Sequence, residues 1–181
     1  MGKGNAMGSY TSLAKWFHWS TVALLGIAIP FGFVIGHIKD ESKMPFYMVH
    51  ESAGLTILAV ALARLAWRLR HPPPPLPDSI PAPLRKASAA VHHALYALLI
   101  LQPIGGFIAT NAWGFPQQGA TAYLGFIDLP KFMETNEGLA GVVGTAHTIG
   151  GWTIVVLLVL HIGGAIFHQA IRRDGTLLRM V

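Results

Sequence analysis

Residues 141–171 read GVVGTAHTIGGWTIVVLLVLHIGGAIFHQAI, a stretch long and apolar enough to cross a bilayer as a helix. It nevertheless carries His147, His161 and His168. The first two are 14 residues apart, so they return to within about 40° of one face and lie about 21 Å apart along the axis. Polar side chains inside a membrane are costly and are usually functional. The stretch therefore predicts a membrane helix that binds something through imidazole at two depths.

The composition of the whole chain is that of a membrane protein. Of its 181 residues, 52% are hydrophobic and only 12% are charged, and the mean hydropathy is +0.50. Charged residues make up about a quarter of an ordinary soluble domain. The sequence therefore predicts an all-α membrane protein in which residues 1–181 form one bundle of four transmembrane helices. The predicted spans are residues 17–35, 47–69, 87–110 and 141–168.

Cysteine is absent from the chain. Disulfides, thiolate metal sites and covalent haem attachment through a CxxCH motif are therefore excluded. Any cofactor has to be held by histidine, methionine or oxygen ligands. The first span is not followed by a small-residue cleavage site, so we interpret it as an uncleaved anchor.

Basic residues are distributed unevenly between the predicted loops. Ten of them fall on the side of the two termini: Lys3, Lys15, Arg64, Arg68, Arg70, Arg85, Lys86, Arg172, Arg173 and Arg179. Only Lys39, Lys43 and Lys131 fall on the other side. The positive-inside rule then places both termini in the cytoplasm. The net charge of +5 reflects this topology and does not indicate a nucleic-acid partner.

Four histidines fall into two pairs when they are placed by depth. His18 and His161 lie near the inner surface, on the first and fourth spans, and His50 and His147 lie near the outer surface, on the second and fourth. Two neutral imidazoles from facing helices suit the axial positions of a haem iron, and bundle interiors hold such cofactors. Zinc is the competing interpretation, but it usually takes four ligands and each level offers only two. We therefore predict an inner and an outer haem iron.

Arg64 follows His50 by 14 residues and so shares its helix face near the opposite surface. Either it snorkels to the boundary, or it pairs with a buried anion such as a haem propionate. Several small residues near the proposed ligands leave room for a macrocycle, although they also suit ordinary helix packing. These are Gly54, Gly150, Gly151, Gly163 and Gly164.

Three further histidines have no assigned partner. His92 and His93 point about 100° apart, so at most one of them faces any given site. For both we favour a role at the membrane boundary over ligation, and we keep them as candidates for a quinone or proton site. His168 follows His161 by seven residues on nearly the same stripe. It is either an interfacial helix end or a hydrogen-bonding partner for a quinone. The segment from Asn111 to Gly138 is either a lid across the bundle or an interfacial turn.

These motifs together resemble the bacterial cytochrome b561 family, which is related to the cytochrome b subunits of hydrogenases and formate dehydrogenases. The resemblance rests on His18-Trp19, His50, the Arg64–Arg68 motif before a proline run, Tyr96 with Pro103, the spacing of His147 and His161, His168, and the Asp174–Met180 run. It implies two haem b groups, one between His18 and His161 and one between His50 and His147. It also implies transmembrane electron transfer with ubiquinone as the acceptor.

The resemblance includes superoxide oxidases. It therefore implies an oxidoreductase that takes electrons from superoxide on the periplasmic side and reduces ubiquinone. The predicted outer segments argue against steering of an anion, because six acidic residues accompany the three lysines: Asp40, Glu41, Glu51, Asp128, Glu134 and Glu137. The alternative is a membrane anchor and electron relay for a separate dehydrogenase or a soluble cytochrome c, since an acidic face suits a basic partner. A third class is a histidine-lined metal transporter.

Overall fold

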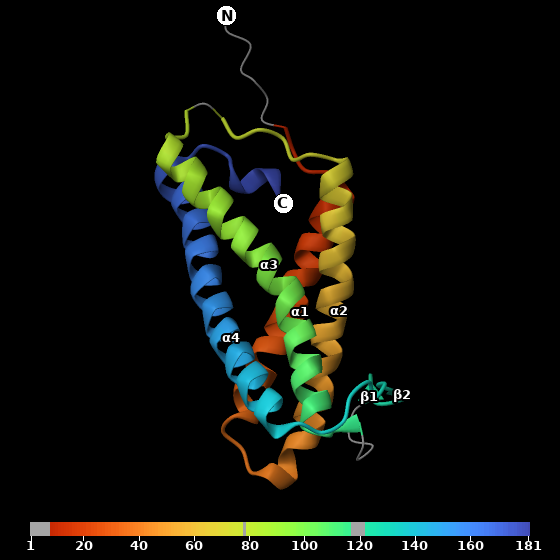
Figure 1. Ribbon diagram of the computed structural model, residues 1–181. Helices are drawn as coiled ribbons and strands as arrows, with labels where there is room; N and C mark the ends of the chain where they lie inside the picture. The colour runs from red at the N-terminus through yellow and green to blue at the C-terminus, as the bar shows by residue number, and fades with distance from the viewer. Residues whose placement is uncertain (1–7, 78, 117–121) are drawn as a thin grey trace, which may run out of the picture.

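Four long helices make up most of the computed structural model (Figure 1), which describes residues 8–77, 79–116 and 122–181. They are α1 (Ser12–Ile35), α2 (Lys43–Arg70), α3 (Ala82–Ala112) and α4 (Glu137–Ile166). Each is long and apolar enough to cross a membrane. The prediction of an all-α, four-helix membrane bundle is confirmed.

Two of the helices, α1 and α4, begin at capping residues that lie outside the apolar windows. The Thr11 hydroxyl accepts a hydrogen bond from the Ala14 N–H at 3.3 Å and starts α1. The Asn136 side chain accepts one from the Leu139 N–H at 3.0 Å and starts α4. Such side chains satisfy amides that have no partner within the helix. Each helix begins four or five residues before its predicted span, because hydropathy locates only the apolar part of a helix.

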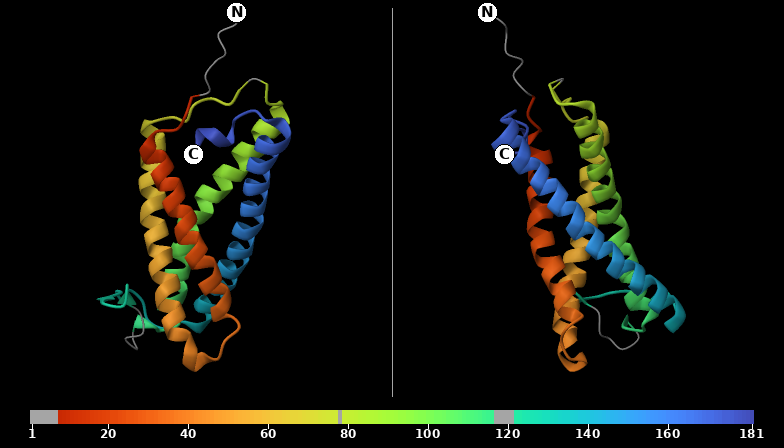
Figure 2. Two further views of the ribbon diagram at one scale, coloured as in Figure 1. Left: turned by 180° about the vertical axis from the view of Figure 1, so that it is seen from behind. Right: turned by 90° about the vertical axis from the view of Figure 1, so that its left-hand side faces the viewer.

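The bundle consists of two helix pairs. The closest packing joins α1 to α2 and α3 to α4, and α2 then packs against α3. The beginning of α1, the C-terminus and the proline-rich residues 72–77 lie at one end of the bundle, which we name the terminal end (Figures 1 and 2). The opposite end, named the hairpin end, holds the α1–α2 connector with the short helix η1 (Asp40–Ser42) and the segment before α4. The predicted inner side is the terminal end, and the placement of that end in the cytoplasm stays a prediction. Lys3, one of the residues used for it, lies outside the described residues.

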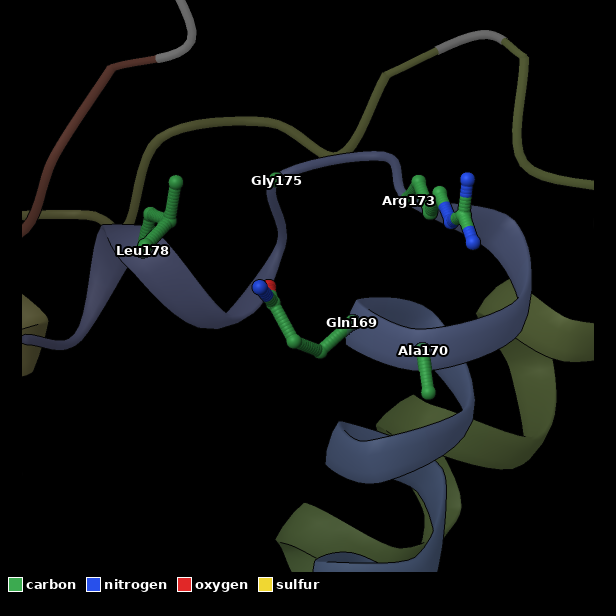
Figure 3. Close-up of a pocket in the computed structure, with 5 residues that line it drawn as sticks. All are labelled: Gln169, Ala170, Arg173, Gly175 and Leu178. Carbon is green, nitrogen blue, oxygen red and sulfur yellow. The ribbon is translucent and has the colours of Figure 1, made fainter.

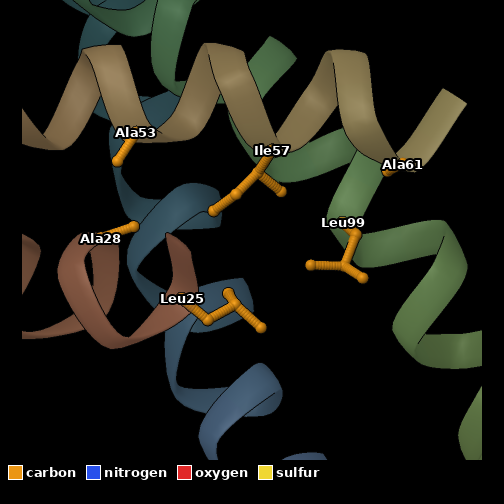
Figure 4. Close-up of a cluster of buried hydrophobic side chains, with 6 residues drawn as sticks. All are labelled: Leu25, Ala28, Ala53, Ile57, Ala61 and Leu99. Carbon is orange, nitrogen blue, oxygen red and sulfur yellow. The ribbon is translucent and has the colours of Figure 1, made fainter. Parts of the chain in front are cut away.

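The buried apolar core is small and lies between α1, α2 and α3 (Figure 4). It consists of Leu25, Ala28, Ala53, Ile57, Ala61 and Leu99. In α4 only Ala140, Gly150 and Ile154 are buried, whereas large apolar side chains such as Val142 and Val159 are exposed. Lipid is the medium in which such surfaces are stable, so the bundle is held by helix packing rather than by a large core.

The C-terminal segment closes the terminal end. After α4 the chain forms a π-helical turn, η3 (Phe167–Arg172), and a short helix, η4 (Leu177–Arg179). The buried Arg179 side chain donates to the carbonyls of Gly8, at 3.1 Å, and Pro74. The Lys15 ammonium donates to Val181 O at 2.5 Å. These bonds tie both ends of the chain to the proline-rich connector.

At the hairpin end, the segment between α3 and α4 contains two short strands. Strand β1 (Ala122–Tyr123) pairs antiparallel with β2 (Ile127–Asp128), so that Ala122 lies opposite Asp128 and Tyr123 opposite Ile127. The strands lie beside α2 (Figure 1). Between the two interpretations left open by the sequence, this position favours an interfacial turn over a lid.

Candidate cofactor-binding site

At the hairpin end, His50 of α2 and His147 of α4 face each other. Their ring centroids are 5.9 Å apart and their planes are nearly perpendicular, at 89°. His50 Nδ1 lies 2.7 Å from Ala28 O, and His147 Nδ1 lies 3.0 Å from Gln102 O. A backbone carbonyl only accepts hydrogen bonds, so both Nδ1 atoms carry the proton and both Nε2 atoms keep a free lone pair. Metal-binding imidazoles are held in this way.

Each of these two rings rests on a glycine of the neighbouring helix. A Cβ on Gly32 of α1 would lie 2.6 Å from His50 Cε1, and a Cβ on Gly106 of α3 would lie 3.0 Å from His147 Cε1. No side chain larger than hydrogen fits at Gly32 unless the ring moves. The glycines are thus part of the structure that orients the two imidazoles.

The two halves of the bundle repeat this arrangement. In α1, the carbonyl of residue 28 and the glycine at residue 32 contact the histidine of α2. In α3, the carbonyl of residue 102 and the glycine at residue 106 contact the histidine of α4. In both cases the glycine follows the carbonyl by four residues, which places both on one helix face. A proline, Pro30 or Pro103, lies between them.

The glycines chosen from the sequence lie elsewhere. Gly150 packs against the Gln102 side chain, a Cβ on Gly54 would reach Pro103 Cβ only at 4.0 Å, and nothing lies within 4 Å of a Cβ on Gly163 or Gly164. None of the contacts of these glycines is with a histidine ring, and the prediction that they leave room for a macrocycle stays a prediction. The available signal was a glycine within a few residues of an intrahelical proline.

At the terminal end, three histidines come together. The rings of His18 (α1) and His161 (α4) have centroids 6.1 Å apart, and those of His92 (α3) and His161 are 5.1 Å apart. The structure thus joins the pair predicted from depth and adds His92, whose role at the membrane boundary stays a prediction. His93 is exposed. Of the two adjacent histidines only His92 therefore faces the site, in agreement with the angle of about 100° between them.

Arg64 turns toward this set. Its guanidinium nitrogen lies 3.2 Å from His18 Nδ1 and its Cζ lies 5.2 Å from the centre of the Tyr96 ring. Arginine only donates hydrogen bonds, so His18 Nδ1 accepts here and the proton of the neutral ring is on Nε2. Nε2 becomes free to bind a metal only when Arg64 releases Nδ1.

Both imidazole pairs fit the axial positions of a haem iron. A metal–imidazole bond is about 2 Å long, so two nitrogens on opposite sides of one metal lie about 4 Å apart and the ring centroids somewhat farther. The centroid separations of 5.9 and 6.1 Å accommodate this. Within the described residues, no group of three or more His, Cys, Asp or Glu could hold a bare metal ion. The donor set therefore suits a metal that brings its other ligands with it.

His168 has a partner that the sequence did not reveal. Its Nδ1 lies 2.6 Å from Asp174 Oδ2, which also accepts from Arg172 Nε at 3.0 Å. The other oxygen, Oδ1, accepts from the Thr176 hydroxyl at 2.6 Å. Desolvation raises the pKa of Asp174, but the hydrogen bonds from Thr176, His168 and Arg172 outweigh it and hold that pKa well below its usual range. The left-handed conformation of Arg173, with φ of 52°, reverses the chain so that the carboxylate reaches the histidine.

An open pocket of about 600 Å³ lies beside this network (Figure 3). Its lining comes from η3 and the segment after it: Gln169, Ala170, Arg173, Gly175 and Leu178. The pocket combines a cationic and an amide side chain with apolar carbon at the terminal end of the bundle.

The basic residues of the hairpin end are largely neutralised. Lys43 forms an ion pair with Asp40 at 2.8 Å, and Lys131 forms one with Glu134 at 2.9 Å. Two of the three lysines predicted for the outer side are therefore bound to carboxylates. The remaining one, Lys39, is exposed.

Comparison with known proteins gives matches over nearly the whole chain. A family model described as prokaryotic cytochrome b561 matches residues 9–181. The chain is 32% identical over 175 residues to cytochrome b561 homolog 2 of Escherichia coli, covering 95% of this chain and 90% of that protein. It is 28% identical over 174 residues to the probable superoxide oxidase CybB of Yersinia pestis, covering 95% of each. It is 25% identical over 178 residues to cytochrome b562 of Cereibacter sphaeroides, covering 95% of this chain and 94% of that protein.

Proposed function

The chain belongs to the prokaryotic cytochrome b561 family of membrane electron-transfer proteins with haem b, and we propose that it carries electrons through two haem b groups from a donor at the hairpin end to ubiquinone at the terminal end. The observation that carries this proposal is the contact of two histidine pairs at opposite ends of a multi-pass bundle. We place the bundle in the bacterial inner membrane, with the terminal end in the cytoplasm.

At the hairpin end, His50 and His147 would hold one haem through their Nε2 atoms. The carbonyls of Ala28 and Gln102 fix the orientation of the rings and make the imidazoles stronger electron donors. A haem iron with two imidazole ligands supplies a reversible one-electron change and has no open position for dioxygen. This part of the chain therefore serves electron transfer rather than oxygen binding.

At the terminal end, His18 and His161 would hold the second haem. Arg64 has to release His18 for this. The released guanidinium is then available to pair with a haem propionate, the buried anion considered for Arg64 from the sequence. Desolvated pairs of arginine and carboxylate are strong and geometrically specific. His92 would remain beside the ligand pair as a neighbour of His161.

For ubiquinone we propose the region of His168, with His92 and His93 as the other candidates. Reduction of ubiquinone to ubiquinol consumes two electrons and two protons, so the site needs a polar group at the membrane surface. His168 is held by Asp174 through Nδ1, which leaves Nε2 for a quinone oxygen. His93 is exposed, and His92 is in contact with the proposed ligand His161.

For the donor we propose superoxide. A relative with 28% identity is named a probable superoxide oxidase. Two superoxide anions would each lose one electron and leave as dioxygen, and the two electrons with two protons would convert ubiquinone to ubiquinol. A specific observation favours a second candidate, because Lys43 and Lys131 are already paired with carboxylates. In that case the chain is an anchor and relay for a dehydrogenase or for a basic soluble redox protein.

Replacement of His50 or His147 by alanine tests the haem assignment. We expect each variant to lose one of two haems per chain and to stop superoxide-driven reduction of ubiquinone. Haem content and the reduced absorption spectrum are measured together with ubiquinol formation. His37→Ala is the matched control, because His37 is an exposed histidine just after α1 at the same end, and its Nδ1 lies 2.7 Å from Phe33 O. Retention of both haems in H50A or H147A would refute the pairing.

Two measurements on the wild-type protein distinguish superoxide from a separate redox protein as the electron donor. Rapid haem reduction by superoxide in the isolated protein supports the oxidase. Co-purification of a stoichiometric redox subunit, without reduction by superoxide, supports the relay.

A further inference from the structure

The strands β1 and β2 are attached to one side of α2, along a stripe that we name the α2 stripe (Met48, Ser52 and Thr56). The Leu124 N–H donates to Ser52 Oγ at 2.9 Å. The hydroxyls of Tyr123 and Thr56 are 3.0 Å apart and share a hydrogen bond. The hydroxyl groups of the stripe thus find their partners in the hairpin.

The α2 stripe faces away from the interior of the bundle. Ser52 lies about 200° around the helix from His50, which points toward α4. Farther along α2 the same side continues with Ala59 and Ala63, and both are exposed. A membrane helix exposes this side to lipid. The hairpin therefore lies on the outside of the bundle, where acyl chains would otherwise cover α2.

The depth of the hairpin follows from its attachment to α2. Ser52 is nine residues after Lys43, which is about 13 Å along the axis. A helix of 28 residues is about 42 Å long and the hydrocarbon layer is about 30 Å thick, so an upright, centred α2 places Ser52 about 7 Å below the hydrocarbon boundary. Interfacial segments bury their apolar side chains to about 5–10 Å. Exposed aromatic side chains of the same end, Trp113 and Phe132, fit an interfacial belt.

The tip of the hairpin has the properties of a segment in contact with lipid. Leu124, Phe126 and Ile127 are 55%, 74% and 49% exposed, although all three are apolar. The three amides of the tip nevertheless all donate hydrogen bonds: Leu124 to Ser52 Oγ, Gly125 to Ala122 O at 3.2 Å and Phe126 to Tyr123 O at 3.3 Å. Satisfied backbone donors are what a chain at membrane depth requires, because water is not available there.

We propose that residues 122–128 form an interfacial anchor that inserts Leu124, Phe126 and Ile127 among the acyl chains of the leaflet at the hairpin end. The partner is the boundary between headgroups and acyl chains of a phospholipid bilayer, which is bound through apolar area rather than through a specific headgroup. The hydrogen bonds to Ser52 and Thr56 fix the hairpin at this depth.

The absence of cysteine from the chain allows a direct test with single-cysteine variants. Phe126→Cys is labelled with an environment-sensitive fluorophore in phosphatidylcholine vesicles. Quenching is measured with lipids that carry a nitroxide at acyl carbon 5 and with aqueous iodide. Lys39→Cys is the water reference at the same end, and Val156→Cys, exposed on α4, is the acyl-chain reference.

We expect lipid nitroxide to quench the label at residue 126 as strongly as the label at residue 156, and iodide to quench it several-fold less than the label at residue 39. Leu124→Cys should give the same result, so the test survives if one variant does not fold. Quenching by iodide equal to that of the water reference, without quenching by lipid, overturns the proposal. Protection from both quenchers that is lost on dilution of the protein in lipid overturns it too, because a second copy of the chain then covers the hairpin.

Discussion

Two glycines determine how close the hairpin-end imidazoles can lie to their neighbouring helices. A methyl group on Gly32 or Gly106 would meet the ring of His50 or His147 at 2.6 or 3.0 Å. The hydrogen-bond acceptors of these rings are backbone carbonyls, which substitution cannot remove. The glycines are therefore the positions at which ring orientation can be altered without touching a ligand.

We expect Gly106→Ala to displace the His147 ring and to cost about 1–3 kcal/mol of stability, the usual cost of overpacking. Gly32→Ala should have the larger effect because its contact is closer. Haem content, the midpoint potential of the hairpin-end haem and the unfolding temperature in detergent are the measurements. Gly105→Ala is the matched control, since nothing lies within 4 Å of a Cβ there. Equal behaviour of the Gly105 and Gly106 variants would contradict the assignment.

The depressed pKa of Asp174 predicts a pH-dependent contribution to stability. A carboxyl whose pKa is lower in the folded state stabilises that state above its ordinary value of 3.8 and loses this contribution as the pH falls toward the folded value. We expect Asp174→Asn to lower the unfolding temperature at pH 7 and the difference from wild type to shrink as the pH is lowered below about 4. Thermal unfolding is followed across pH, with the exposed Glu41→Gln as the control. A difference that does not change with pH would show that the charge of Asp174 is not responsible.

At the scale of single residues, the sequence predicted the contacts that depend only on how deep each histidine lies in the membrane. The spacing of His147 and His161 and the positions of His18 and His50 were enough to bring each pair to about 6 Å. Whether these residues bind haem stays a prediction. The position of His92 and the two glycines depended on which helix faces meet, and one sequence does not contain the rotation of each helix. The partner of His168 depended on the left-handed turn at Arg173.

At the scale of the helices, one buried hydrogen bond between side chains joins α2 to α3. Glu51 of α2 accepts a hydrogen bond at 2.6 Å from the Thr110 hydroxyl of α3, and both side chains are buried. The other carboxyl oxygen, Oε2, has no partner among the described residues. This bond is therefore a polar tie between the two helix pairs, placed where lost hydrogen bonds are expensive.

We expect Thr110→Val to destabilise the bundle by about 1–3 kcal/mol, because it leaves a buried carboxyl without its donor. Unfolding in a denaturing detergent, followed by circular dichroism, measures the change. Thr148→Val provides the control, since its hydroxyl is exposed and bonds only within α4, to Gly144 O at 3.1 Å. A loss of stability no larger than that of the control would show that the tie is not important.

The elements themselves were predictable because twenty apolar residues are needed to cross a membrane. Hydropathy therefore found every long helix. The starts were missed by four or five residues, since a polar cap such as Thr11 or Asn136 lies outside any apolar window. The β1–β2 pair has two residues per strand, too few to leave a periodic pattern in the sequence.

On the scale of the whole molecule, the distribution of basic residues predicts which compartment each end faces. With both termini in the cytoplasm, a fluorescent protein fused after Val181 should fluoresce and alkaline phosphatase fused there should be inactive. Fusions within the hairpin-end connector, after Ser42, should behave in the opposite way. The reverse pattern would move the proposed donor to the cytoplasm and the quinone region to the other surface.

The repeated arrangement at the hairpin end has a consequence for how the protein is put together. Each half of the chain, α1 with α2 or α3 with α4, already orients its own histidine through its own carbonyl and its own glycine. Each half also supplies one histidine of the terminal-end pair. Each haem would then lie between the two halves and be bound by one histidine from each. Haem binding would therefore be the step that joins two halves that have already folded. Two fragments separated within the proline-rich connector should recombine when haem is supplied and remain apart without it.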